Sequence, residues 1–512
     1  MKIRLSVSSL SSLTIAIVVC LAYAPPLLSL TFPQDFGYSS TSELLIDGGR
    51  IWEVNRMFHP FELEIGAKAD SSDRGSAFGW AVKRLLAYQT ATLELRDAAG
   101  DGLWVKGRLG LRGSSESGPG RRYNSAGLGP YLWYQAGFHS NWYATLLVRG
   151  TSEPESLPHY TGIGRKRSRF GMSTGEIDQS HFGYQNDWFS ADFGRGREIW
   201  GTNSDRNLTL AGSAPSYERL VLEGKFKRFA YRYFYGFLES TRDSIVVERY
   251  TVGRALEYRN ARNLVIGVSE VSILAGANRP VDWSFLNPFA NHVEIEANKR
   301  NNYTGISSDV DYSLYVDWLP RSNLRLSGSF DIDDLQVDRK AQVRVGDMIG
   351  YLGHVAWTPV ESPVGITLFA DYVQVATFSM QHTNPYCNLV SRGELLGHPI
   401  GNDAVLKQAG LRTVLPFELI IEQRVGELQW GDNSLINNPY NGYRSPLRTS
   451  FPSGEVRTNL YYELGVEGFL TERFRYRIDG HVDLKHRGTG SAKERWELAL
   501  EYDLPFQFLV QK

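Results

Sequence analysis

The stretch 305–333, GISSDVDYSLYVDWLPRSNLRLSGSFDID, decides the fold because apolar and polar residues alternate along it in two successive runs. From Val310 to Trp318 every second residue is apolar, while Asp311 and Asp317 stand on the opposite face. After a short link, the same alternation resumes over the second half of the stretch. A period of two residues is typical of a β-strand with one apolar and one polar face. The stretch therefore predicts two adjacent antiparallel strands joined by a tight turn.

The same alternation recurs along most of the chain after residue 100. Clear examples are the runs 102–112, 457–470, 472–484 and 493–504. Counting such runs predicts about 18 strands, an even number within the range of bacterial outer-membrane barrels. The fold class that we expect is therefore all-β, a transmembrane outer-membrane β-barrel of about 18 antiparallel strands.

The links between the strands separate a barrel from a soluble β-sandwich, because they alternate between short and long. The short links are expected at 139–140, 186–187, 227, 260–261, 319–321, 359–363, 415–417 and 470–472. The long links are expected at 113–126, 150–176, 197–216, 240–247, 276–304, 334–346, 379–403, 429–456 and 485–492. Short periplasmic turns that alternate with long external loops are typical of an outer-membrane barrel. Greek-key connections in a sandwich do not keep that order.

The composition combines many aromatic residues with an unremarkable mean hydropathy. The 512 residues include 50 Gly, 27 Tyr, 25 Phe and 12 Trp. The mean hydropathy of -0.30 averages an apolar, lipid-facing row, a polar, lumen-facing row and long polar loops. Trp318, Trp357, Trp496 and Tyr502 stand on apolar faces, where aromatic rings form the girdles of a membrane barrel. The formal net charge of -1 argues against a nucleic-acid-binding protein.

The first 24 residues have the pattern of a secretory signal peptide. Two basic residues precede an apolar run that closes on Ala22-Tyr23-Ala24, a small-residue cleavage pattern. Cleavage there leaves Cys387 as the single cysteine of the exported chain. An intramolecular disulfide is then impossible.

The rest of the chain divides into two parts. Residues 25–100 are expected to form an N-terminal segment that plugs the lumen or lies in the periplasm. This segment includes a short helical pattern near 80–88 and a weak strand pattern at 91–98. Residues 101–512 form the predicted transmembrane barrel.

No motif of a serine hydrolase, a zinc protease, a phosphate-binding loop or a metal-binding Cys/His cluster occurs in the sequence. We therefore expect a protein that is not an enzyme, with no catalytic residues, no cofactor and no metal site. Asp331, Asp333 and Asp334 form a carboxylate cluster at the outer end of a predicted strand. Carboxylate oxygens suit Ca²⁺ or sugar hydroxyls, and a solvated loop rim is the alternative interpretation.

The long link at 429–456 has a composition that suits glycan binding. It carries Trp430, Asn433, Tyr440 and Tyr443. Sugar rings stack on aromatic faces, while their hydroxyl groups pair with amides and carboxylates. Ordinary turn chemistry is the alternative, because Asn, Asp and Gly are common in any loop.

Several short runs in the middle of the chain occur in a characteristic order. They are Gly194–Gly201, Leu208–Ala211, Glu248–Tyr250, Leu264–Glu270, Phe330–Asp334 and Leu396–Ala404. In this order the chain resembles the capsule assembly Wzi family of outer-membrane proteins. The resemblance implies a surface lectin that holds or organises capsular polysaccharide and is not an enzyme. The positions that it implies for polysaccharide binding are Arg197, Trp200, Glu270, Asp331, Asp333 and Asp334.

Three functions stay open at this point, of which an outer-membrane hydrolase such as a phospholipase is the most distant. The first is a lectin-like barrel that binds capsular or extracellular polysaccharide at the cell surface, and the alternative is a porin-like channel for small polar solutes. The expected partners are surface polysaccharide, outer-membrane lipid and lipopolysaccharide, and the barrel-assembly machinery, with no nucleic acid. We expect a monomer in the outer membrane of a Gram-negative-type bacterium.

Overall fold

The computed structural model describes most of the chain from residue 98 onward. The described residues are 52–53, 63–64 and 98–510, with gaps at 118–124, 140, 154–167, 169, 187, 202–206, 243–245, 261–262, 299–306, 335–345, 444–449, 472 and 488–493. The predicted signal peptide, the helix near 80–88 and nearly all of the strand at 91–98 lie outside the described residues. Of that strand only Ala98 is described, and it begins a helical turn rather than a strand.

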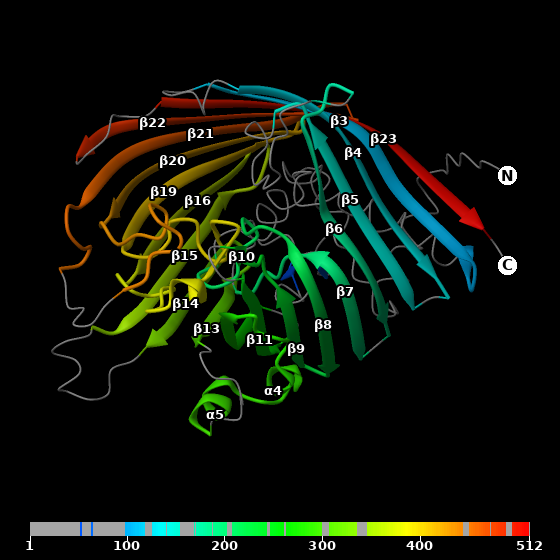
Figure 1. Cartoon of the computed structure of the whole chain (residues 1–512). Coiled ribbons are helices and arrows are strands. Elements are labelled where there is room, and N and C mark those ends of the chain that lie inside the picture. Colours follow the sequence, from blue (N-terminus) through cyan, green and yellow to red (C-terminus); the bar gives the residue numbers. More distant parts are fainter. Residues whose placement is uncertain are drawn as a thin grey trace.

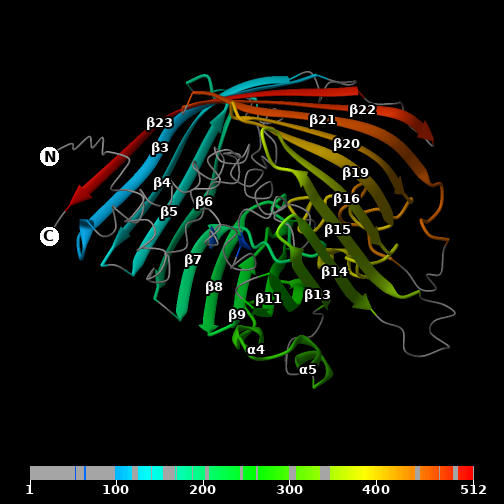
Figure 2. The ribbon, with the colours of Figure 1, turned by 180° about the vertical axis from the view of Figure 1, so that it is seen from behind.

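Eighteen long strands form a single closed wall (Figure 1, and from behind Figure 2). They are β3 (Leu103–Ser117), β4 (Ser125–Phe138), β5 (Trp142–Thr151), β6 (Thr174–Gln185), β7 (Phe189–Gly196), β8 (Tyr217–Phe226), β9 (Phe229–Phe237), β11 (Val246–Arg259), β12 (Leu264–Ala277), β13 (Ser307–Arg321), β14 (Leu324–Asp334), β15 (Met348–Val360), β16 (Gly365–Val375), β19 (Ala404–Leu415), β20 (Leu419–Trp430), β21 (Arg457–Thr471), β22 (Phe474–Arg487) and β23 (Glu494–Val510). Every neighbouring pair is antiparallel, and pairing of β23 with β3 and of β9 with β11 closes the sheet.

Short elements accompany this wall. The two-residue strands are β1 (Trp52–Glu53), β2 (Leu63–Glu64), β10 (Thr241–Arg242), β17 (Val390–Ser391) and β18 (Glu394–Leu395). The helices are α4 (Trp283–Leu286), α5 (His292–Ala297) and the 3₁₀ helix η5 (Pro385–Cys387). No helix in the described part of the chain is both long enough and apolar enough to cross a membrane.

The barrel fold and the order of its links are confirmed. Turns such as 227–228 between β8 and β9, and 416–418 between β19 and β20, close one end of the barrel. Long links such as those after β16 and β20 all leave from the opposite end. Because every second connection is short, each strand pair is a hairpin, and the wall forms without a crossover.

The two faces of β23 show how the alternation is used. Trp496, Leu498, Leu500 and Tyr502 point outward and are each between 39% and 42% exposed. Glu501 and Asp503, on the opposite face, are buried in the lumen. Asp503 pairs with Arg108 of β3 at 2.7 Å, and Glu501 pairs with Arg475 of β22 at 3.2 Å. Apolar side chains therefore face lipid, while charges on neighbouring strands neutralise one another inside.

Candidate functional site

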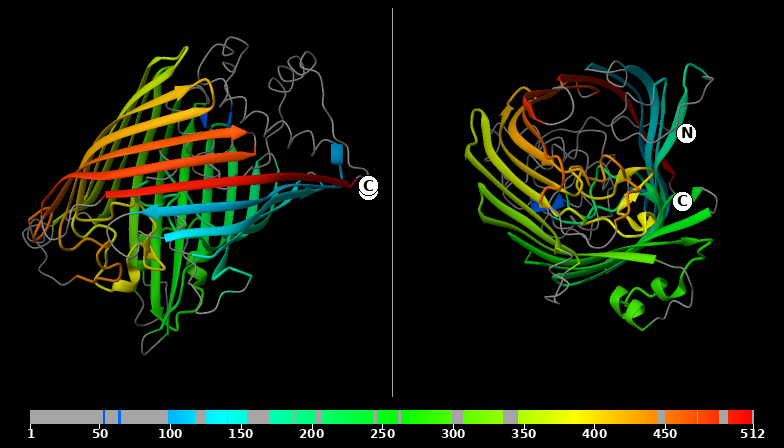
Figure 3. Two further views of the ribbon diagram at one scale, coloured as in Figure 1. Left: turned by 90° about the horizontal axis from the view of Figure 1, so that it is seen from above. Right: turned by 60° about the vertical axis from the view of Figure 1, so that its left-hand side comes forward.

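Three long links turn inward and pack inside the barrel near its long-loop end. They are the β7–β8 link (197–216), the β16–β19 link (376–403) and the β20–β21 link (431–456). In the right-hand view of Figure 3, the ring of strands surrounds the yellow and orange segments of the last two links. Their apolar residues share one buried cluster with inward-facing residues of the wall. Members from the links are Trp200, Leu208, Leu210, Leu396, Ile400 and Leu435, and members from the wall include Leu352, Val373 and Val375.

One arginine of the wall holds the β16–β19 link in place. Arg249, on the inward face of β11, is 1% exposed. Its Nε donates to the Tyr386 carbonyl at 2.6 Å, and its Nη2 donates to the Asn388 and Val390 carbonyls at 3.1 and 2.8 Å. Its Nη1 pairs with Glu239 at 2.8 Å. Charge-assisted hydrogen bonds to backbone carbonyls fix the path of this segment, because an isolated guanidinium is costly to bury.

A second buried group ties the β16–β19 link to the β20–β21 link. The Asp403 carboxylate accepts hydrogen bonds from the Ser453 amide at 2.8 Å, the Ser453 hydroxyl at 2.5 Å and the Asn433 amide at 3.1 Å. It also accepts one from the Thr377 hydroxyl at 2.8 Å. The neighbouring Asn402 accepts from the Leu435 amide at 2.8 Å. The two links are therefore one hydrogen-bonded unit across this side of the lumen.

This unit presents half-buried tyrosines. The ring centroids of Tyr386 and Tyr440 lie 6.4 Å apart, and the Arg249 guanidinium lies 5.4 Å from the Tyr440 ring. Tyr443 lies beside Phe378, with 5.2 Å between the centroids. Burial, and after it the Glu239 carboxylate, raises the pKa of Tyr440 to about 12. The phenol is therefore neutral at physiological pH, and its hydroxyl group donates a hydrogen bond to Glu239.

Carboxylates stand beside these tyrosines on the inward faces of β13 and β14. Asp333 accepts a hydrogen bond from the Met380 amide at 2.8 Å, and Asp331 accepts one from the Thr209 hydroxyl at 2.6 Å. Asp334 is half-buried at the end of β14. Within the described residues, no group of three or more His, Cys, Asp or Glu side chains is arranged to hold a metal ion.

The residues predicted from the 429–456 link lie in or beside the same unit. Tyr440 and Tyr443 are half-buried within it, and Trp430 packs against the buried cluster at the end of β20. The Asn433 side chain donates to the Ser453 hydroxyl at 2.8 Å and so helps to hold the link. The structure therefore brings Asp331, Asp333 and the β20–β21 residues to one end of the lumen.

Of the other three residues predicted from the family resemblance, Arg197 and Trp200 belong to the β7–β8 link at the same end of the lumen, and only Glu270 lies away from it. Arg197 pairs with Asp178 at 2.5 Å on the wall. Trp200 is 3% exposed and donates from its Nε1 to Glu198 at 3.0 Å, so its ring belongs to the buried cluster. Glu270 lies on the outer face of the barrel, because its register partner Arg254 faces outward. The structure does not bring Glu270 to the lumen.

Sequence reasoning missed Arg249, Asn402 and Asp403 as the residues that organise this end of the barrel. All three fall in runs that carried the family resemblance, 248–250 and 396–404. Nothing local distinguishes them from other polar residues, since their partners come from distant links. Tyr386 was missed for the same reason.

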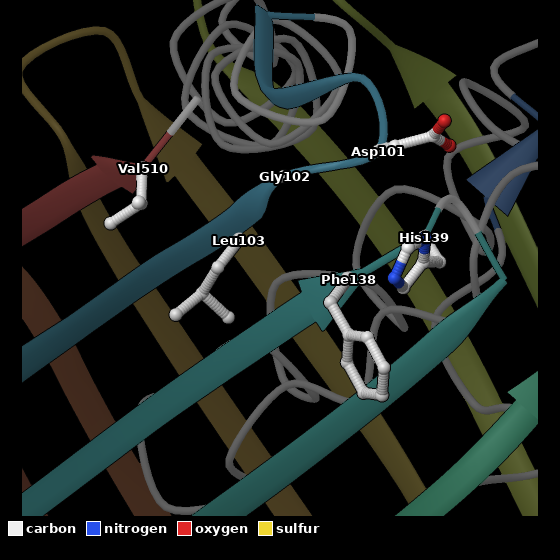
Figure 4. Close-up of a pocket in the computed structure, with 6 residues that line it drawn as sticks. All are labelled: Asp101, Gly102, Leu103, Phe138, His139 and Val510. Carbon is white, nitrogen blue, oxygen red and sulfur yellow. The ribbon is translucent and has the colours of Figure 1, made fainter. Parts of the chain in front are cut away.

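A shallow apolar depression of about 390 Å³ lies at the opposite, short-turn end of the barrel (Figure 4). Asp101, Gly102, Leu103, Phe138, His139 and Val510 line it. These residues lie at or next to the start of β3, the end of β4 and the end of β23. The depression is therefore separate from the site at the long-loop end.

No protein-family model and no curated protein matches the sequence of this chain. The fold is similar to that of Wzi, an outer-membrane protein involved in group 1 capsule assembly in Escherichia coli and a carbohydrate-binding β-barrel. The TM-score is 0.58 at 11% identity, over 93% of this chain and 99% of that chain. The outer-membrane protein OprD from Pseudomonas aeruginosa matches with a TM-score of 0.45 at 13% identity, over 78% of this chain and 94% of its own. A BenF-like porin from Pseudomonas fluorescens gives 0.46 at 8% identity, over 78% and 99%. At these identities the similarity shows the fold, an outer-membrane-type β-barrel.

Proposed function

We propose that this protein binds or organises capsular or extracellular polysaccharide at the surface of a Gram-negative-type cell, without catalysing a reaction. The observation that carries the proposal is the unit formed by the β16–β19 and β20–β21 links. It sets half-buried Tyr386, Tyr440 and Tyr443 beside carboxylate and amide groups. Tyrosine rings offer apolar faces to pyranose rings, and carboxylates and amides accept or donate to sugar hydroxyls.

The way this unit is held supports binding rather than a mobile channel lining. The buried guanidinium of Arg249 and the carboxylate of Asp403 fix both links from within. A surface that is ordered before binding loses little conformational entropy when a ligand arrives. The binding free energies of weak contacts with successive sugar residues then add along a repeating polymer. The structural similarity to Wzi, a carbohydrate-binding barrel, agrees with this proposal.

The proposed setting follows from the two faces of the wall. The outward rows of Leu, Trp and Tyr side chains fit outer-membrane lipid and lipopolysaccharide, and the barrel-assembly machinery would insert such a chain. A closed barrel leaves no unpaired wall strand for a partner, which supports a monomer.

A porin-like channel is the second candidate, and one observation favours it. Ion pairs on the lumen face of β21 and β22 remain accessible to solvent. The side chains of Arg477 and Asp479 are 48% and 34% exposed, and those of His481 and Glu463 are 31% and 35% exposed. This side of the lumen is therefore hydrated, as the wall of an aqueous path would be.

Retention of the cell's own surface polysaccharide by the purified barrel in lipid nanodiscs tests the proposal. Tyr443→Ala should weaken retention roughly fivefold to tenfold, since one aromatic contact contributes about 1 kcal/mol. Tyr502→Ala, on the lipid-facing side of β23, is the matched control and should leave retention unchanged.

Deleting the gene is the corresponding test in cells. We expect polysaccharide to shift from the cell-bound to the released fraction, with its total amount unchanged. Unchanged cell-bound polysaccharide, together with steady conductance of the purified barrel in planar bilayers, would refute binding and favour the channel.

A further inference from the structure

The link between β12 and β13 folds over the outside of the barrel wall. Its residues 279–298, called the outer segment below, contain α4 and α5, which lie outside the ring of strands in the right-hand view of Figure 3. Alternation along β9 puts Arg232 and Phe234 on the lumen side and Tyr231, Tyr233 and Tyr235 on the outer side. The outer segment covers these outward tyrosines.

Tyrosine hydroxyls of the outer wall fasten the segment. Tyr233 donates to the Phe285 carbonyl at 2.8 Å, and Tyr250 of β11 donates to the Arg279 carbonyl at 2.8 Å. Tyr231 donates to the Pro288 carbonyl. Phe285 and Ile295 of the segment are fully buried in one cluster with the rings of Tyr233 and Tyr250. The outward tyrosine row of this part of the wall is therefore largely a docking surface for the chain itself.

An ion pair lies beneath the outer segment, on the side of the wall that faces the membrane. Arg254 pairs with Glu270 at 2.9 Å, between β11 and β12. The segment supplies further hydrogen-bond partners to both groups. Arg254 donates to the Asn287 carbonyl at 3.3 Å, and the His292 amide donates to Glu270 at 3.1 Å.

The position of this pair along the strands places it at membrane depth. Arg254 stands about five residues above Arg259, where β11 ends at the short-turn side, and a strand needs about 9–11 residues to cross a bilayer. The outward residues next to it, Leu256 and Val268, are 45% and 48% exposed and belong to the lipid-facing rows. An arginine and a glutamate that faced lipid directly there would be strongly unfavourable.

We propose that the outer segment is a lipid-contacting part of the barrel, which takes the place of lipid over the Arg254–Glu270 pair and itself lies against the outer leaflet. Trp283, Phe289 and Val293 are its contact residues. They are 80%, 82% and 52% exposed, and the Phe289 ring stacks on the outward Tyr231 of β9, with 5.6 Å between the ring centroids. They continue the apolar surface of Leu256 and Val268, and tryptophan is favoured at membrane interfaces.

The chemistry of the segment supports lipid as the occupant of this face. Arg279 and Asp282 of the segment are buried and pair with each other at 3.3 Å, and the partly exposed Glu294 carboxylate on α5 accepts a hydrogen bond from the Asn298 side chain at 3.0 Å. The large side chains left exposed on α4 and before α5 are aromatic. A segment that replaces lipid against the wall must offer lipid an apolar surface of its own, because hydrocarbon surrounds it at that depth. This inference is independent of polysaccharide binding at the lumen.

Fluorophores at single introduced cysteines in the full-length protein carrying Cys20→Ser, reconstituted in vesicles, test the proposal. The labelled variants are Phe289→Cys, Leu314→Cys as a lipid-facing control on β13, and Asn438→Cys as an exposed control on the β20–β21 link. The native Cys387 is buried and does not compete for the reagent. Quenching is measured with nitroxide on the lipid acyl chains and, separately, with iodide in the water.

We expect the label at residue 289 to be quenched in the same way as the label at 314, strongly by nitroxide on the acyl chains and weakly by iodide. The label at 438 should show the reverse. Iodide quenching at 289 equal to that at 438 would overturn the proposal. Protection of the 289 label from both quenchers, with cross-linking between two copies, would assign the face to a second copy and would also overturn it.

Discussion

Replacing Arg249 with methionine should release the β16–β19 link while leaving the barrel wall intact. The substitution keeps the volume of the side chain but removes the guanidinium that donates to three backbone carbonyls and pairs with Glu239. Breaking a buried pair by removing one partner costs about 3–5 kcal/mol. Solvent screening does not reduce this cost, because the side chain of Arg249 has no accessible surface. Glu239, at 22% exposure, recovers part of its hydration, which puts the expected loss near the lower limit.

A loss of about 3 kcal/mol raises the population of the undocked link by roughly two orders of magnitude, because 1.4 kcal/mol is tenfold. Hydrogen exchange at the Leu389 and Leu396 amides reports this opening, since both donate within the docked link. Their exchange should accelerate by roughly that factor if opening limits it. Amides in β3 and β23 should be unaffected.

Arg477→Met provides the matched control, because Arg477 is 48% exposed and pairs with Asp479 on the far side of the lumen. Its removal should change exchange in the β16–β19 link by little. Equal exchange at residues 389 and 396 in wild type and R249M would refute the reasoning that the guanidinium holds the link. Polysaccharide retention should fall in R249M if the proposed function is correct.

Two further outcomes follow from buried groups in the links. Asp403→Ala leaves two backbone amides and two hydroxyl groups without the carboxylate that accepts their hydrogen bonds. The docking of the β20–β21 link should therefore weaken by about 3 kcal/mol. Limited proteolysis within 431–456 should then be faster than in wild type. Burial, and after it the Asp309 carboxylate, raises the pKa of the Cys387 thiol to about 12. The folded protein should therefore resist maleimide at pH 8 and react only after denaturation. Rapid labelling of the folded protein would show instead that the η5 turn opens.

The wall of the barrel was predictable because its signals are local. The alternation in 310–318 depends on neighbouring residues, and so does the length of a link such as 227–228. Both follow from the two-residue period of a strand and the few residues that a hairpin turn needs. The strand order then follows from the hairpins in sequence.

The candidate site was predictable only in part. Tyr440, Tyr443 and Asp333 do lie in one unit at the long-loop end of the lumen. Trp200 is also an aromatic residue of a type that suits a sugar ring, but its own ring is enclosed by the buried cluster. Composition indicates which side chains suit a sugar, whereas accessibility depends on how distant links fold over one another.

The sequence by itself determined the all-β architecture, the number and order of the strands and the end of the barrel at which the long links gather, because these depend on periodicity and spacing within a few residues. Only the tertiary structure decided what the links do. It turned the β16–β19 link inward onto Arg249 and the β12–β13 link outward onto Tyr233. It also set Glu270 against Arg254 on the membrane side of the wall. A link folds toward whichever buried donor or acceptor it satisfies, and those partners lie on strands far away in the sequence.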